Sequence, residues 1–165
     1  MPESIITFQD AEARGLKSLL SHYNLIIKSV PTDKAIPGSF WGDSEAGLID
    51  NTLYLRPDTP LHSALHEACH YICMDNVRRE GLHTNAGGDY DEENAVCYLQ
   101  ILLADKLKDV GRSRMQQDMD AWGYSFRLGS TRKWFEEDAE DAKTWLLHHK
   151  IIDNDGLPTW TMRQD

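Results

Sequence analysis

The chain has 165 residues, enough for one ordinary domain with a buried core and too few for two well-sized ones. Its composition, 41% hydrophobic and 27% charged, is that of a soluble globular protein and excludes a disordered or fibrous one. A net charge of −10 argues against nucleic acid as the main partner, because phosphate binding depends on a basic surface.

Targeting signals and cysteine usage favour a cytoplasmic protein. The opening residues MPESIITFQD carry neither the basic nor the apolar segment of a secretory signal. No stretch approaches the roughly 20 apolar residues of a membrane span, so no membrane partner is expected. Cys69, Cys73 and Cys97 all fall within apolar helical patterns, which predicts buried, reduced thiols.

The first part of the chain predicts one helix and a small sheet. Thr7 is expected to cap a helix that extends to about His22, because apolar residues recur at helical spacing over this segment. The segment 25–30 is short, β-branched and followed by Pro31, which is typical of a strand. Further β-like runs at 38–43, 47–50 and 52–56 are separated by turn-forming residues. Together these segments predict a small, mainly antiparallel sheet.

The rest of the chain is predicted to be mainly helical. Thr59 followed by Pro60 is a typical helix start, and Gly81 marks the corresponding stop. Further helices are expected over 90–109 and 113–122, and another begins at a Ser130 cap. The segment after Asp153 is expected to be irregular.

Three histidines at four-residue intervals share one face of the helix predicted to begin at Pro60. At about 1.5 Å of rise per residue, His62 and His70 are about 12 Å apart, too far to bind one ion together. The pair His66 and His70 forms an HExxH motif with Glu67. Two neutral imidazoles can hold Zn²⁺, and the glutamate can accept a proton from a metal-activated water.

A catalytic zinc site needs a third protein ligand. The longer motif HExxHxxGxxH is excluded, because Cys73 and Asn76 occupy its glycine and histidine positions. A carboxylate at the start of the helix expected over 90–109 is the alternative, and the candidates are Asp89, Asp91, Glu92 and Glu93.

Among these, Glu92 begins a helical face that Val96, Leu99 and Leu103 continue, so this helix can pack on the histidine helix while presenting the carboxylate. A structural role for Glu92 fits the spacing equally well. Asp89 and Glu92 form a D-x-x-E capping box, in which the glutamate only bonds the helix start.

These residues resemble a known family. His66-Glu67-x-x-His70, followed by Glu92-x-x-Ala95, resembles the gluzincin metallopeptidases, and the run EENAVCYLQILL is similar to the corresponding helix of ImmA/IrrE-type peptidases. The resemblance covers 47–103. It implies a zincin-like α+β fold, one zinc per chain held by His66, His70 and Glu92, Glu67 as general base, and intracellular hydrolysis of peptide bonds, often in a regulatory protein.

Two departures from the family pattern stand out. Val96 occupies the position where the family usually has asparagine or aspartate, so the usual support for a histidine ligand must come from elsewhere or is missing, at a cost in affinity or activity. No helix-turn-helix module is visible.

A donor to the developing oxyanion is also expected, and no spacing chooses among the candidates, which are His83, Tyr90, Tyr124, His148 and His149.

The sequence thus predicts a single domain, 1–165, with a zincin core over 1–110 and a helical region over 111–165. The expected activity is zinc-dependent hydrolysis of a peptide or protein substrate, which pairs in extended form with the strand at 52–56. One alternative is a zinc-bearing regulatory or interaction protein with weak or no catalysis, in which the C-terminal helices bind a partner protein. Another is hydrolysis of a non-peptide amide by the same chemistry.

Overall fold

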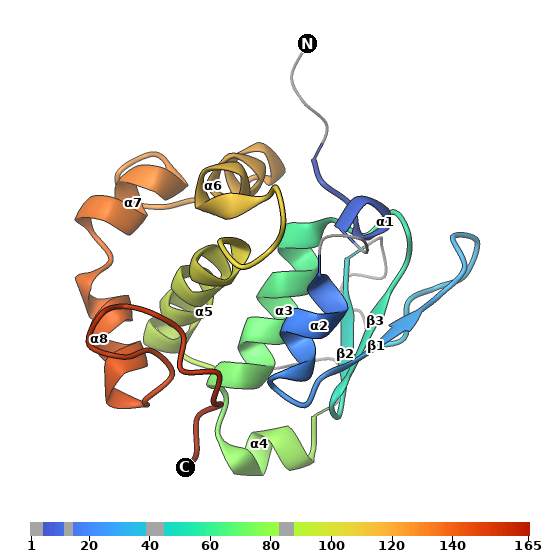
Figure 1. Ribbon diagram of the computed structural model, residues 1–165, viewed down its shortest axis with the longest axis horizontal. Helices are drawn as coiled ribbons and strands as arrows, with labels where there is room; N and C mark the ends of the chain where they lie inside the picture. Colours follow the sequence, from blue (N-terminus) through green and yellow to red (C-terminus); the bar gives the residue numbers. More distant parts are fainter. Residues whose placement is uncertain (1–4, 12–14, 39–44, 83–87) are drawn as a thin grey trace.

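The computed structural model describes residues 5–11, 15–38, 45–82 and 88–165, and it has an α+β architecture. A small sheet lies on one side of the molecule, and α3 (Leu61–Cys73) crosses behind it. The long helix α5 (Tyr90–Ala104) packs on the other side of α3 and lies between it and the last two helices of the chain (Figure 1). Two of the predicted metal-binding residues lie on α3, in the middle of this arrangement.

The sheet is mixed rather than mainly antiparallel. Its strands are β1 (Ile26–Ser29), β2 (Gly47–Ile49) and β3 (Thr52–Leu55), in the order β1-β3-β2. β2 and β3 are antiparallel, but β1 pairs with β3 in parallel. The long connection between them makes this possible, because a parallel pair needs a crossover of a dozen or more residues. The prediction that β3 pairs with substrate is wrong, because both of its edges already carry a neighbouring strand.

The N-terminal helix predicted as one element is two, α1 (Phe8–Ala11) and α2 (Leu16–Ser21). Gly15, immediately before α2, has a φ of 95°, a conformation that glycine adopts without steric cost. The buried side chains of α2, among them Leu16 and Leu20, anchor it to the core.

The histidine helix also differs from its prediction at both ends. Pro60, not Thr59, is the N-cap of α3, and the Thr59 hydroxyl instead accepts a hydrogen bond from the Arg56 amide at 2.9 Å. Met74 is extended and ends the helix after Cys73. The residues up to Gly81 form a separate short helix, α4 (Asn76–Glu80), whose start Asp75 caps by accepting from the Arg78 amide.

The C-terminal half is helical, as predicted, with changed boundaries. α5 is followed by α6 (Gly111–Trp122), α7 (Thr131–Glu137) and α8 (Glu140–His148), so the helix expected after Ser130 divides at Asp138. Two predicted caps are confirmed: Asp89 accepts from the Glu92 amide at 2.9 Å, and Ser130 from the Lys133 amide at 3.2 Å.

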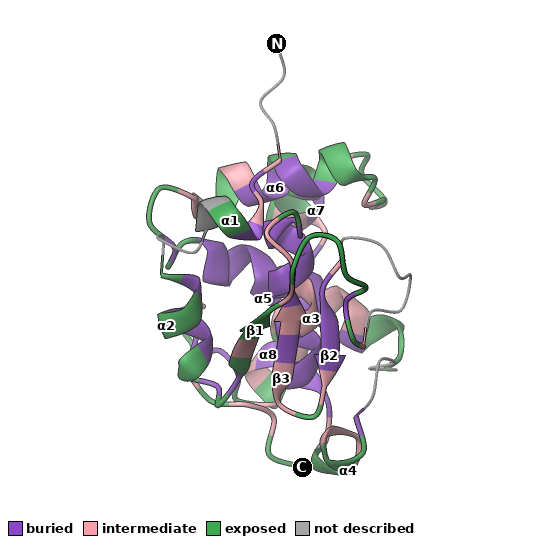
Figure 2. Cartoon of the chain, turned by 90° about the vertical axis from the view of Figure 1, so that its right-hand side faces the viewer, coloured by how far each residue is buried: buried purple, intermediate pink, exposed green. Residues whose placement is uncertain are grey.

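Helix α5 forms the centre of the core. It packs against α3, α6 and α8, and nearly all its residues after the first turn are buried, as the purple colouring of Figure 2 shows. A helix surrounded by other elements is apolar on most sides. The thiols of Cys69, Cys73 and Cys97 are free and buried in the same core, which confirms the prediction for them.

A buried carboxylate fixes the beginning of α5. The Glu92 side chain is only 4% exposed, and Arg78 of α4 donates to both of its oxygens, at 2.5 and 3.0 Å. Arg163 adds a third bond at 3.2 Å. Gly88 lies against this cluster with a φ of 102°, and a Cβ atom there would come within 2.2 Å of Glu92 Oε2, so only glycine fits.

The segment that supplies Arg163 also ties α3 to α4. The Arg163 amide donates to the Ile72 carbonyl at 3.0 Å, and Arg79 donates to the Arg163 carbonyl at 3.1 Å. The Asn76 amide donates to the Asp165 carbonyl at 2.7 Å. One short segment therefore connects the end of α3, the start of α4 and the first turn of α5. Among the described residues, no helix is both long and apolar enough to span a bilayer.

Replacing Arg163 with alanine is expected to lower the free energy of unfolding by about 1–3 kcal/mol, because a buried carboxylate loses one of its two cationic partners. Urea denaturation measures the change. Arg132→Ala is the matched control: this arginine is 73% exposed, and its pairing with Glu136 predicts a loss under about 0.5 kcal/mol. Equal effects of the two substitutions would contradict a supporting role for Arg163.

Candidate metal centre

Two helices bring three potential metal ligands together. His66 and His70 lie one turn apart on α3, and Glu93 projects from the first turn of α5. The Nε2 atoms of His66 and His70 lie 2.9 and 3.1 Å from the two oxygens of the Glu93 carboxylate. One ligand atom from each residue fits within 4.8 Å of the others, and no other such group exists among the described residues.

The carboxylate that faces the two histidines therefore belongs to Glu93 and not to Glu92, which was predicted to complete a metal set with His66 and His70. The carboxylate of Glu92 is paired with Arg78 and Arg163. Successive residues of a helix point about 100° apart, so the two glutamates cannot face the same neighbour. The predicted capping box is also incomplete: the Glu92 amide donates to the Asp89 side chain, but the Glu92 carboxylate accepts from the two arginines instead of bonding the helix start.

A sequence signal for Glu93 did exist. Glu93, Cys97 and Gln100 are spaced at i, i+4 and i+7, which places them on one face of α5. A face that carries a carboxylate, a thiol and an amide within an otherwise apolar helix indicates a polar neighbour. The prediction of Glu92 rested instead on the apolar face formed by Val96, Leu99 and Leu103.

Gln100 supports the first histidine. His66 Nδ1 donates to Gln100 Oε1 at 2.9 Å, and Gln100 Nε2 donates to the His62 carbonyl at 2.9 Å. The fully buried amide is thereby fixed in one orientation and keeps His66 Nε2 directed toward Glu93. Gln100 thus supplies the hydrogen bond to a histidine that Val96, a buried apolar residue of the core, cannot supply.

His70 is held differently. Its side chain is buried, and its Nδ1 atom has no hydrogen-bond partner within the described part of the chain. The fixed atom is Nε2, which faces Glu93. A buried imidazole whose ring nitrogen faces the same carboxylate as a second histidine is suited to metal ligation.

Glu67 lies beside the cluster on α3, where burial raises the pKa of its carboxyl, partly opposed by nearby His70 and His66. For Glu93, burial opposes ionisation, but hydrogen bonds from His66 and His70 outweigh it and lower the pKa. The pKa values of these two neighbouring carboxyls, one on α3 and one on α5, are thus displaced in opposite directions. Such a difference between neighbouring acids is common where one binds charge and the other moves protons.

His62 is not part of the cluster. It is buried, and burial together with the nearby His66 lowers the pKa of His62 to about 3, so its ring stays neutral. Its Nδ1 atom lies 3.3 Å from the Tyr124 hydroxyl, and its ring packs against Trp122. This agrees with the prediction that only one adjacent histidine pair can chelate.

Of the five candidate oxyanion donors, the structure brings one to the cluster. The Tyr124 ring packs edge-on against His66 at 5.8 Å between centroids. Tyr90 lies 79% exposed on α5, and His148 and His149 pack edge-on against each other at the end of α8. His83 lies outside the described residues.

The donor set fits zinc. Two imidazole nitrogens and one carboxylate oxygen form a His₂Glu set, which leaves a coordination position for water or substrate. Histidine ligands also disfavour magnesium and calcium, which prefer oxygen donors. Comparison of the chain with protein-family models, curated proteins and solved structures found no match.

Replacing Glu93 with glutamine is expected to weaken zinc binding strongly, because the site loses its only anionic ligand. Glu92→Gln is the matched neighbour and should retain about one zinc per chain while reducing stability, because its charge pairs with arginines. Elemental analysis after dialysis measures the zinc content, and urea denaturation the stability. Loss of zinc in the Glu92 variant alone would restore the ligand role predicted from the sequence.

Gln100→Met keeps the side-chain volume and removes the acceptor of His66 Nδ1. We expect a loss of about 10- to 100-fold in zinc affinity, as for other residues that orient a ligand. Competition with a chelator measures it. Gln100→Glu keeps an acceptor at the same place and should bind zinc more tightly than the methionine variant. Equal affinities of Gln100→Met and the unmodified protein would refute the orienting role.

Proposed function

We propose that the protein is a zinc-dependent metallopeptidase. The observation that carries the proposal is the convergence of His66, His70 and Glu93 from two helices, with Glu67 beside them. The resemblance of the HExxH segment to gluzincins of the ImmA/IrrE type supports the same conclusion. A zincin-like arrangement is proposed on that basis, now with Glu93 as the third ligand.

In this proposal His66, His70 and Glu93 hold the zinc. When bound, zinc supplies an acidified water and polarises the scissile carbonyl. Glu67 accepts the proton of the attacking water and delivers it to the leaving amine. Burial raises the pKa of Glu67, which brings the carboxyl closer to the range in which it can both take up and release a proton.

Tyr124 is proposed as the donor to the oxyanion. Its ring lies against His66, and its hydroxyl lies near His62, whose neutral ring can accept a hydrogen bond. Burial raises the pKa of Tyr124, so the hydroxyl keeps its proton. A hydroxyl held beside the reacting carbonyl stabilises the charge that develops on its oxygen.

The substrate is proposed to be a peptide or protein in the cytoplasm. Three buried, unpaired cysteines suit a reducing compartment. The rival interpretation, a zinc-bearing interaction protein with little catalysis, was motivated by the replacement of the usual polar residue by Val96. That motivation weakens, because Gln100 supplies the missing hydrogen bond to a histidine.

Glu67→Gln is expected to keep the zinc and to lose at least about 100-fold in turnover, because general-base catalysis contributes roughly 10²–10⁴-fold. Zinc content and mass spectrometry of a cleaved peptide library are the two measurements. Glu80→Gln, on the exposed face of α4, is the control and should leave both unchanged. A zinc-loaded protein that cleaves no library peptide would favour the interaction protein instead.

A further inference from the structure

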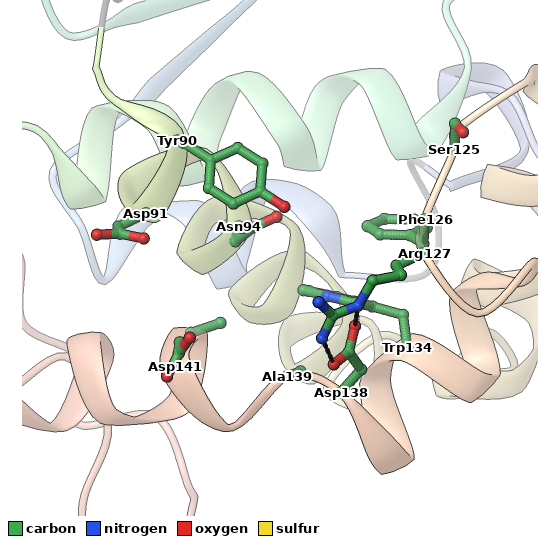
Figure 3. Close-up of a pocket in the computed structure, with 11 residues that line it drawn as sticks. Tyr90, Asp91, Asn94, Ser125, Phe126, Arg127, Trp134, Asp138, Ala139 and Asp141 are labelled. Carbon is green, nitrogen blue, oxygen red and sulfur yellow. Dashed lines mark hydrogen bonds and ion pairs between the residues drawn. The ribbon is translucent and has the colours of Figure 1, made fainter.

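A cavity lies on the side of α5 that faces α7 and α8, whereas the proposed metal ligands lie on the side that faces α3. It is a space of about 190 Å³ between the first turn of α5 above and α7 and α8 below, closed on one side by the loop that follows α6 (Figure 3). Its lining residues come from four segments, which are the start of α5, the loop 125–127, α7 with its C-terminal end, and the start of α8.

We propose that this cavity binds a lysine or arginine side chain of the substrate. The inference rests on the proposed peptidase function and adds the chemistry of the substrate to it. Three features of the cavity support this proposal: its charge, its aromatic side chains and its position relative to the metal ligands.

The cavity carries a net negative charge. Its lining holds three carboxylates, of Asp91, Asp138 and Asp141, and one guanidinium. That guanidinium belongs to Arg127, which donates from Nε to Asp138 at 2.9 Å and from Nη2 to the second oxygen, so this pair is internally neutralised. The charges of Asp91 and Asp141 remain, at the opposite end of the cavity in Figure 3.

Aromatic rings lie at the Arg127–Asp138 end of the cavity and, in the case of Tyr90, over its middle (Figure 3). Phe126 stacks on Trp134 with 4.5 Å between ring centroids, and the Tyr90 ring lies over the cavity from α5. Ring faces of this kind pack against the methylene stem of a lysine or arginine and attract its charged end. A compact ion suits the cavity poorly, because its carboxylates do not converge into a metal-binding group among the described residues.

Two lining residues of the cavity are chain neighbours of residues at the metal centre. Asn94 follows the ligand Glu93 in α5, and Ser125 follows Tyr124, whose ring lies against His66. Neighbouring Cα atoms are about 3.8 Å apart, so a peptide with its scissile bond at the centre can place a side chain here within about three residues. The cavity is therefore positioned to select substrate sequence.

Asp91 and Asp141 also lie in the first turns of their helices, where acids stabilise the helix dipole. That role alone would leave substrate choice unaffected. The control is Glu140→Gln, which removes an exposed first-turn acid of α8 that does not line the cavity.

The test is cleavage of a diverse peptide library by the unmodified, zinc-loaded protein. Lysine or arginine should be enriched at one position within about three residues of the cleaved bond. The best peptide is then compared with its norleucine counterpart by kcat/KM, in the unmodified protein, in Asp91→Asn/Asp141→Asn and in Glu140→Gln. We expect kcat/KM to favour lysine over norleucine by about fivefold or more in the unmodified protein, because two exposed carboxylates attract the charged side chain. This preference should shrink at high salt, which screens exposed charges.

In the double variant this preference should disappear, with the norleucine rate and zinc content unchanged. Glu140→Gln should keep it. Cleavage without enrichment of basic residues, or a preference that survives in the double variant, would overturn the inference and leave the peptidase proposal standing. Absence of all cleavage by a zinc-loaded protein would overturn both.

Discussion

The buried carboxylate of Glu92 constrains the arrangement on which the candidate site depends. A carboxylate this deeply buried is tolerated only with charged partners, and it has two, Arg78 from α4 and Arg163 from the last segment of the chain. Satisfying it fixes the rotation of the first turn of α5. Because the next residue points about 100° away around the helix, the same rotation directs Glu93 toward His66 and His70. The pairing of Glu92 is thus a condition for the position of Glu93.

The histidine helix contributes a complementary constraint. α3 is buried along most of its length, so the polar atoms of its histidines need partners within the protein. Gln100 meets part of this need by bonding both the His66 ring and the His62 carbonyl, which links two consecutive turns of α3 to one side chain of α5. Tyr124 lies against the same turns from the loop after α6. The polar network therefore also fixes the register between α3 and α5.

Sequence reasoning succeeded where the determinants are local and failed where they are distant. The Asp89 and Ser130 caps and the four-residue spacing of His66 and His70 depend on neighbours within one helical turn. The spacing of Glu93, Cys97 and Gln100 was a local signal for Glu93, but the pairing that directs Glu92 away from the histidines includes Arg163, 71 residues away. The parallel pairing of β1 with β3 is likewise long-range, and the break of α3 at Met74 accompanies contacts of the segment 163–165 with α3 and α4.

The first turn of α5 carries residues of both the proposed metal centre and the proposed side-chain cavity, so the two lie within one turn of the same helix. Beyond this turn, α5 is enclosed by α3, α6 and α8 and offers almost no surface. Within it, the Glu93 side chain is 46% exposed and Tyr90 79% exposed, while Glu92 is held inside. Glu93 thus faces the metal centre and Tyr90 and Asp91 face the acidic cavity (Figure 3). A peptide that lies across this turn would meet both, which couples the choice of side chain to the position of the bond that is cut.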